Sequence, residues 1–167
     1  AHGFVTSTSL STFSNIVSNT GVVQNYVNVN GIAERRYAGS GAGYGGDKGF
    51  LAYGNNYTVQ LNNYNLVSNT GVIGADFNVY SNGQSWRAGA TYDGDKAVFG
   101  YGNSGGYVTA GTTKISNTGA YASSSNSVGT ARYSAAAASY GGDKVIFGFG
   151  KSDSPQTYHS TTNLMSN

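Results

Sequence analysis

The chain has 167 residues with 26 glycines, 14 tyrosines, one proline and no cysteine, and only 10% of its residues are charged. Its net charge of +2 comes from nine basic and seven acidic side chains, which argues against the clustered basic surface of a nucleic-acid-binding protein. No apolar run approaches the ~18 residues of a membrane-spanning helix. Few charges, abundant Tyr and Val, and Gly, Asn and Ser for turns predict an ordered all-β protein.

An internal repeat of about 48 residues organises the chain. Ser-Asn-Thr-Gly occurs three times, at 18–21, 68–71 and 116–119. A second marker, Gly-Asp-Lys before an apolar stretch, occurs at 46–48, 94–96 and 142–144. We therefore expect one repeat domain over residues 1–167. It consists of a partial repeat followed by three full ones, with the limits 1–19, 20–69, 70–117 and 118–167.

Four strands are predicted in each full repeat. The first follows Ser-Asn-Thr-Gly, as in residues 22–29, and the second leads from an arginine through small residues to a tyrosine. The third follows the Asp-Lys turn and is nearly all apolar, which suits a strand covered on both faces. The fourth alternates again, as in residues 57–67. Residues 135–138 are alanines with helix propensity, but glycines stand at the equivalent positions of the first repeat, so a strand is expected there.

Two kinds of residue recur once per repeat, and we expect both to be structural. The arginine that begins the second strand is expected to donate to a backbone carbonyl of a neighbouring unit, in preference to a ligand. The Asp-Lys pair is expected to lie in a hairpin turn. A second aspartate joins this turn only in the middle repeat, so a calcium loop is not expected. The positions are Arg36, Arg87 and Arg132 for the arginines, and Asp47, Lys48, Asp95, Lys96, Asp143 and Lys144 for the turns.

The unit resembles a kelch-type propeller repeat, in which an arginine-led strand is followed by an Asp/Lys turn and an aromatic strand ending in glycines, here Phe147-Gly148-Phe149-Gly150. Longer stretches, such as residues 66–72 and 140–148, look like repeats in predicted particle or tail proteins of marine bacteriophages. The first resemblance implies four-stranded, propeller-like blades. The second implies a virion-associated structural or adhesion role and transfers no site residues.

Three blades cannot close the usual ring of four to eight, and an open fan exposes strand edges. We therefore expect closure by association. Two chains forming a six-bladed ring is the simplest arrangement, and insertion into a larger virion assembly is the next. A β-prism or solenoid, with the repeats stacked around a threefold axis, is the alternative fold.

Catalysis, metal binding and a cofactor are not expected. The two histidines, His2 and His159, lie near the chain ends, and His159 with Asp153 and Ser160 is interpreted as a solvated loop. We predict a non-enzymatic structural component of a bacteriophage virion or similar extracellular assembly, whose partners are copies of itself or other virion proteins.

The alternative function is a carbohydrate-binding adhesin. Loops that differ between repeats are where recognition normally lies on a repeated scaffold, and here they are rich in Tyr, Asn and Ser. Under this hypothesis Trp86, Asn82 and Gln84 form one contact cluster for a host-surface glycan.

Overall fold

The computed structural model describes residues 4–6, 9–10, 13–24, 27–28, 35–78, 82–126 and 129–166. Over these residues the chain forms twenty β-strands and no helix, and the strands make several small antiparallel sheets. The predicted all-β class is confirmed. Among the same residues, no helix is long and apolar enough to cross a membrane.

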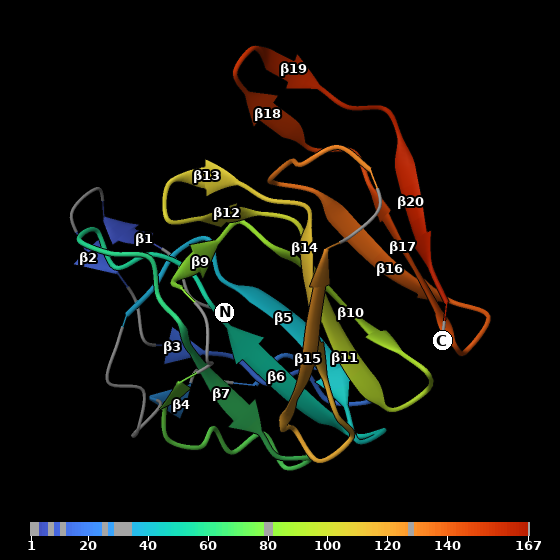
Figure 1. The fold of residues 1–167 in the computed structure, drawn as a ribbon. Helices are drawn as coiled ribbons and strands as arrows, with labels where there is room; N and C mark the ends of the chain where they lie inside the picture. Colours follow the sequence, from blue (N-terminus) through green and yellow to red (C-terminus); the bar gives the residue numbers. More distant parts are fainter. Residues whose placement is uncertain are drawn as a thin grey trace.

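Three sheets make up most of the fold, and they lie side by side like an opened fan (Figure 1). The first sheet contains β5 (Ser40–Tyr44), β6 (Lys48–Ala52), β7 (Asn63–Val67) and β8 (Phe77–Asn78). The second contains β10 (Ala88–Tyr92), β11 (Lys96–Gly100), β14 (Gly111–Ile115) and β15 (Tyr121–Asn126). The third contains β16 (Ala136–Tyr140), β17 (Lys144–Gly148) and β20 (Thr162–Met165). Within each sheet, neighbouring strands are antiparallel and follow chain order.

The first two strands of each sheet form the same hairpin. Tyr44 pairs with Lys48, Tyr92 with Lys96 and Tyr140 with Lys144, and each pair closes a three-residue turn that contains the aspartate. The second turn residue is a glycine with positive φ in all three hairpins, a conformation that glycine adopts without a steric penalty. The Gly-Asp-Lys repeat in the sequence therefore corresponds to a repeated backbone structure.

The four-stranded sheets are offset from the predicted repeats. Ser-Asn-Thr-Gly lies inside a sheet, between β7 and β8 at 68–71 and between β14 and β15 at 116–119. In the first of these turns, the Ser68 hydroxyl accepts a 3.0 Å hydrogen bond from the backbone N–H of Val72. The strand that follows the turn thus becomes the edge of the preceding sheet, and the expected limits at 69/70 and 117/118 fall within sheets.

Short pairings surround the main sheets. One small sheet contains β9 (Gln84–Ser85), β12 (Asn103–Ser104) and β13 (Tyr107–Val108), and β18 (Lys151–Asp153) pairs with β19 (Gln156–Tyr158). Near the N-terminus, β1 (Phe4–Thr6) pairs with β2 (Ser9–Leu10), and β3 (Phe13–Ser14) with β4 (Val27–Asn28). Phe13 faces Asn28 in the same register in which Asn63 faces Asn78, 50 residues further on. Residues 25–26 and 29, from the strand expected over 22–29, lie outside the described residues.

The cores lie between consecutive sheets. Tyr44, Phe50 and Tyr53 from the first sheet pack with Phe99 and Ile115 from the second. At the next interface, Tyr92, Val98 and Tyr101 from the second sheet pack with Val145 and Phe147 from the third. The second sheet therefore buries one face against the first sheet and the other face against the third.

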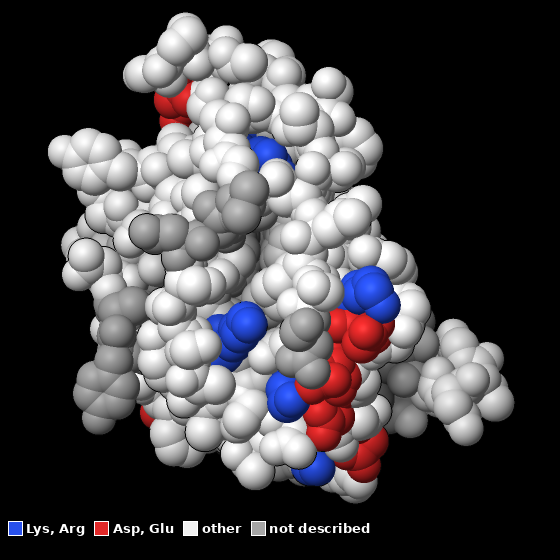
Figure 2. Space-filling model, turned by 45° about the vertical axis from the view of Figure 1, so that its right-hand side comes forward, with Lys and Arg blue, Asp and Glu red and all other residues white. Residues whose placement is uncertain are grey.

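Hydrogen bonds between the sheets repeat at the same interval. The Thr91 hydroxyl donates to the carbonyl of Gly43 at 3.1 Å, and the Ser139 hydroxyl donates to the carbonyl of Thr91. The hairpin turns also meet, since the N–H of Gly94 donates to the carbonyl of Gly142 at 2.7 Å. Aspartates and lysines from successive turns are thereby brought together, and Figure 2 shows a row of acidic side chains flanked by basic ones.

Candidate functional site

The three repeated arginines are buried and bind carbonyl groups of their own sheets. Arg36 donates to the carbonyls of Tyr53 and Asn63 at 3.2 and 3.1 Å. Arg87 donates to those of Phe99 and Gly111 at 2.8 and 2.7 Å, and Arg132 donates to that of Phe147 at 3.4 Å. The carbonyl acceptors belong to the sheet that the arginine begins. The expectation of a carbonyl in a neighbouring unit was wrong, because the long side chain folds back across its own second and third strands.

For Arg87 and Arg132, contact with the preceding sheet is made by the face of the guanidinium group. The Cζ atom of Arg87 lies 5.0 Å from the ring centroid of Tyr53 in the first sheet. The Cζ atom of Arg132 lies 4.2 Å from the ring centroid of Tyr101 in the second sheet. A guanidinium over an aromatic face is attracted by the ring quadrupole, more strongly when water is excluded. Arg87 and Arg132 therefore join the strands of their own sheets and also stabilise the packing between sheets.

The aspartates of the hairpin turns are held by neighbouring side chains. Asn69 donates to Asp47 at 2.9 Å, and Asn117 donates to Asp95 at 2.9 Å. The hydrogen bond from Asn69 and the nearby Lys48 ammonium lower the pKa of Asp47, and Lys144 lowers the pKa of Asp143 in the same way. Within the described ranges, no group of three or more His, Cys, Asp or Glu side chains could hold a metal ion. These carboxylates are engaged within the protein, in Asn-Asp and Lys-Asp contacts.

The structure separates the three residues expected to contact a glycan. Trp86 is 43% exposed, and its ring meets Tyr37 edge-on at a centroid distance of 6.4 Å. Tyr37 also contacts the exposed Tyr57 at 5.8 Å, so these three rings form a small aromatic patch on the surface. Asn82 lines an open hollow of about 530 Å³ that includes Asn55 and Val59. This hollow and the aromatic patch share the chain segment around residues 55–60.

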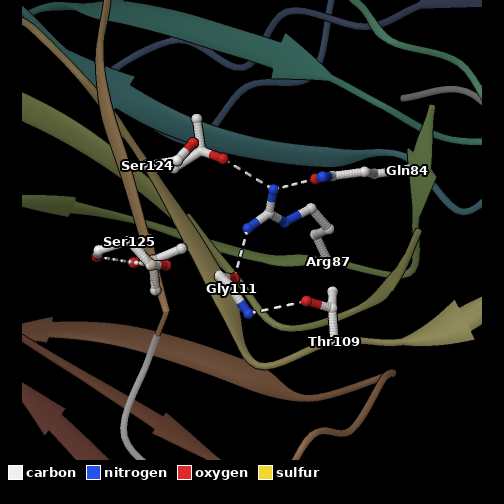
Figure 3. A pocket seen from close by; sticks show the side chains of 8 residues that line it. Gln84, Arg87, Thr109, Gly111, Ser124 and Ser125 are labelled. Atoms are coloured by element: carbon white, nitrogen blue, oxygen red, sulfur yellow. Dashed lines mark hydrogen bonds between the residues drawn. The ribbon is translucent and has the colours of Figure 1, made fainter. Parts of the chain in front are cut away.

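Gln84 belongs to a different place, a polar pocket of about 300 Å³ in the second sheet. Figure 3 shows its side chain beside the guanidinium of Arg87, which donates a hydrogen bond to the Gln84 side-chain oxygen. Thr113 accepts a second hydrogen bond from the same guanidinium at 2.9 Å. The remaining lining residues are polar or small and come from β14, β15 and the segment before them: Thr109, Gly111, Thr112, Ser124 and Ser125.

Sequence patterns did not point to this pocket. Its hydroxyl-bearing residues lie in Ser/Thr-rich stretches that resemble ordinary strand surface. The signal that could have found it is a difference between repeats. Five residues after the glycine of Ser-Asn-Thr-Gly, the second copy of the motif is followed by Asp76 and the third by Ser124.

The histidine and its expected neighbours do not form a catalytic arrangement. His159 Nε2 lies 3.2 Å from the hydroxyl of Ser152. Asp153 instead accepts a 2.6 Å hydrogen bond from the Tyr133 hydroxyl. His2 lies outside the described residues.

No protein-family model matches the sequence, and the curated proteins contain no significant match to it.

The geometry gives two candidate sites: the aromatic patch formed by Tyr37, Tyr57 and Trp86, and the polar pocket beside Arg87. The first offers ring faces with amide groups nearby, and the second offers hydroxyl and amide groups around a buried cation.

Proposed function

We propose that the chain is a non-enzymatic structural repeat protein that associates with further copies of itself through the open face of its third sheet. One comparison carries this proposal. Tyr53, Tyr101 and Phe149 occupy the same position in successive sheets, with φ of 60°, 60° and 62°. Tyr53 and Tyr101 are only 1% and 0% exposed, whereas Phe149 is 60% exposed. An aromatic side chain at this position is buried wherever another sheet follows.

The rest of the third sheet's outer face supports the same conclusion. Tyr44 and Tyr92 are each 5% exposed, while the equivalent Tyr140 is 40% exposed. Leu164 on β20 is also exposed, as are Ala136 and Ala138 on β16. Contiguous apolar area of this kind is typical of an interaction surface. A second copy is the proposed occupant. In the first and second sheets, the equivalent positions are already covered by the next sheet of the same chain.

In this proposal the three main sheets are propeller-like blades of the kelch type, and two chains complete a six-bladed ring. Their antiparallel, chain-order topology fits a blade, and so does the side-by-side packing of β5, β10 and β16. A prism or solenoid is the alternative arrangement and uses the same face. Placement in a bacteriophage particle, or another extracellular assembly, rests on the sequence resemblance described above.

Self-association is tested by sedimentation velocity at micromolar concentration. We expect the wild-type protein to sediment as a dimer or larger species. The double substitution Phe149→Ser with Leu164→Ser should weaken association at least tenfold, because it removes two exposed apolar side chains from the contact face. Tyr158→Ser is the matched control, since Tyr158 is exposed on the β18–β19 hairpin, away from this face. A wild-type protein that remains monomeric would refute the proposal.

The aromatic patch favours carbohydrate binding as a second function. Trp86 and Tyr57 are both exposed, and Tyr37 holds them through ring contacts. Exposed aromatic rings give rigid contact area at low cost in conformational entropy, and neighbouring Asn side chains supply adaptable hydrogen bonds. The patch and the adjoining hollow therefore suit an uncharged sugar on a cell surface.

A glycan array followed by titration calorimetry tests this function. We expect saturable binding of at least one neutral glycan, weakened about tenfold or more in Trp86→Ala through the loss of an aromatic anchor. Tyr107→Ala is the control, because Tyr107 is an aromatic residue even more exposed to solvent than Trp86 but lies on β13, outside the patch. Undiminished binding in Trp86→Ala, or no binding by the wild type, would contradict the assignment.

A further inference from the structure

We propose that the polar pocket beside Arg87 binds the carboxylate group of a small polar ligand, one about the size of a sugar acid. This site is separate from the association face and from the aromatic patch. The three buried guanidinium groups occupy comparable places in successive sheets. In strand register Gln84 stands where Arg36 and Arg132 stand, and Arg87 reaches this place from three residues further along the chain.

In the first sheet, the buried arginine has a carboxylate partner supplied by the chain itself. Asp76 Oδ1 lies 3.6 Å from Arg36 Nη2, and the Asp76 side chain is largely buried. Asn65 lies between the two residues, accepting from Arg36 at 3.4 Å and donating to Asp76 at 2.6 Å. The positive charge of Arg36 is thus balanced by an aspartate within a hydrogen-bonded network, as a buried charge requires.

In the second sheet the equivalent carboxylate has been replaced. Tyr64 pairs with Phe77 in the first sheet, and Thr112 pairs with Ser125 in the second. The residues just before Phe77 and Ser125 are Asp76 and Ser124, so a serine stands where the aspartate would be. Asn65 is likewise replaced by Thr113, although the third sheet has an asparagine, Asn163, which accepts from Arg132 at 2.7 Å.

Arg87 is consequently a buried cation without an ionic partner in the described part of the chain. It is 6% exposed, and no carboxylate among these residues lies within 4.0 Å of its nitrogen atoms. The six aspartates of this part are engaged elsewhere, five of them with Arg36, lysines or asparagines and Asp153 with Tyr133. Burial lowers the pKa of Arg87, as expected where the charged form is poorly compensated.

The pocket lies where the missing carboxylate would enter. Arg87, Thr113 and Ser124 all line it, and Ser124 is exposed, so the position is open to solvent (Figure 3). Its volume of about 300 Å³ corresponds to about ten water molecules at their share of liquid volume. A carboxylate can take the position that Asp76 holds beside Arg36, while hydroxyl groups of the ligand meet Gln84 and Thr109.

Titration calorimetry at low salt with sodium glucuronate, and with glucose as its uncharged counterpart, tests the site. We expect one saturable glucuronate site per chain and at least tenfold weaker binding of glucose. Ser124→Asp should weaken glucuronate binding at least tenfold, because it restores the chain's own carboxylate. The same variant should raise the melting temperature by about 2–4 °C, since it balances a buried charge. Ser123→Asp is the matched control: it adds the same charge to β15, but on the opposite face of the strand and outside the pocket.

Three results would overturn the proposal. The wild type could fail to bind glucuronate at millimolar concentration, or it could bind glucose equally well. Ser124→Asp could also leave binding unchanged while Ser123→Asp has the same effect on melting temperature. Cooperative melting of both variants shows that they are folded. A loss of glucuronate binding in such a variant is then not a loss of structure. None of these outcomes depends on whether the protein self-associates.

Discussion

Replacing Arg36 with methionine should lower the free energy of unfolding by about 3–5 kcal/mol, the range for removing one partner of a buried charge pair. The substitution removes the guanidinium donor from the carbonyls of Tyr53 and Asn63, of which Asn63 keeps the N–H of Tyr53. It also leaves Asp76 as a buried carboxylate without its cation. Each unsatisfied buried polar group adds about 1–3 kcal/mol. Urea denaturation followed by circular dichroism measures the loss.

The neighbouring arginine provides the control for this prediction. Arg35 has the same side chain and is exposed, so Arg35→Met should change stability by no more than about 0.5 kcal/mol. Arg36→Lys should still be clearly destabilising, because an ammonium group cannot reproduce the planar fork that reaches two carbonyls. Equal stability of the Arg35→Met and Arg36→Met variants would show that the carbonyls do not depend on the guanidinium.

Gly89→Ala is the second substitution with a large expected effect, a loss of about 1–3 kcal/mol through overpacking. Gly89 lies on β10, where the second sheet meets the first. A Cβ atom there would stand 2.6 Å from the carbonyl oxygen of Gly41 and 2.7 Å from Cε1 of Phe99. Neither neighbour can retreat easily, because Gly41 belongs to β5 and Phe99 is fully buried. The added methyl group must therefore push the two sheets apart.

Gly74→Ala separates this steric effect from the general effect of replacing glycine. A Cβ atom at Gly74 would meet only the carbonyl oxygen of Leu66, at an ordinary distance of 3.5 Å. Its expected effect is neutral or stabilising by up to about 1 kcal/mol, through reduced freedom of the unfolded chain. Thermal denaturation of both variants makes the comparison. If Gly89→Ala were as stable as Gly74→Ala, the close approach of β5 and β10 would not be required for folding.

The sequence was sufficient to predict an all-β chain with repeated hairpins, because Gly-Asp-Lys and the apolar stretch after it are local signals. It did not reveal which sheet each strand joins. Residues 77–78 follow the Ser-Asn-Thr-Gly turn and pair backward with β7, whereas we had expected them to open a new unit. Alternating polarity tells which face of a strand is buried but not which strand lies beside it.

The arginines show the same limit. Their recurrence correctly suggested carbonyl acceptors, yet the choice between their own sheet and the next depends on how far the side chain folds back. The three residues of the proposed glycan cluster do not all lie together, for a related reason. Trp86 has a φ of 57°, and the backbone turns there, so Trp86 joins Tyr37 while Gln84 faces Arg87. The same positive φ recurs at Ala38 and Ser134, which identifies it as part of the repeated scaffold.

The polar pocket could be inferred only once the sheets were aligned. Asp76 and Ser124 stand at equal distances from their turn glycines, but the sequence does not show that either one faces an arginine about forty residues earlier. Strand pairing supplies that information. The functional meaning of a single Asp-to-Ser difference therefore depends on long-range geometry.

The regular contacts between sheets also bear on how such a chain can change in evolution. Thr91 receives the same kind of contact from Ser139 that it makes to Gly43, and Arg132 rests on Tyr101 as Arg87 rests on Tyr53. A gene duplication that inserted one whole unit would therefore supply a sheet whose two faces already fit both neighbours. After such a duplication, one unit can lose a residue that balances a buried charge, such as Asp76, while the other units keep the scaffold intact. Repetition in this fold thus provides spare copies in which new binding chemistry can arise.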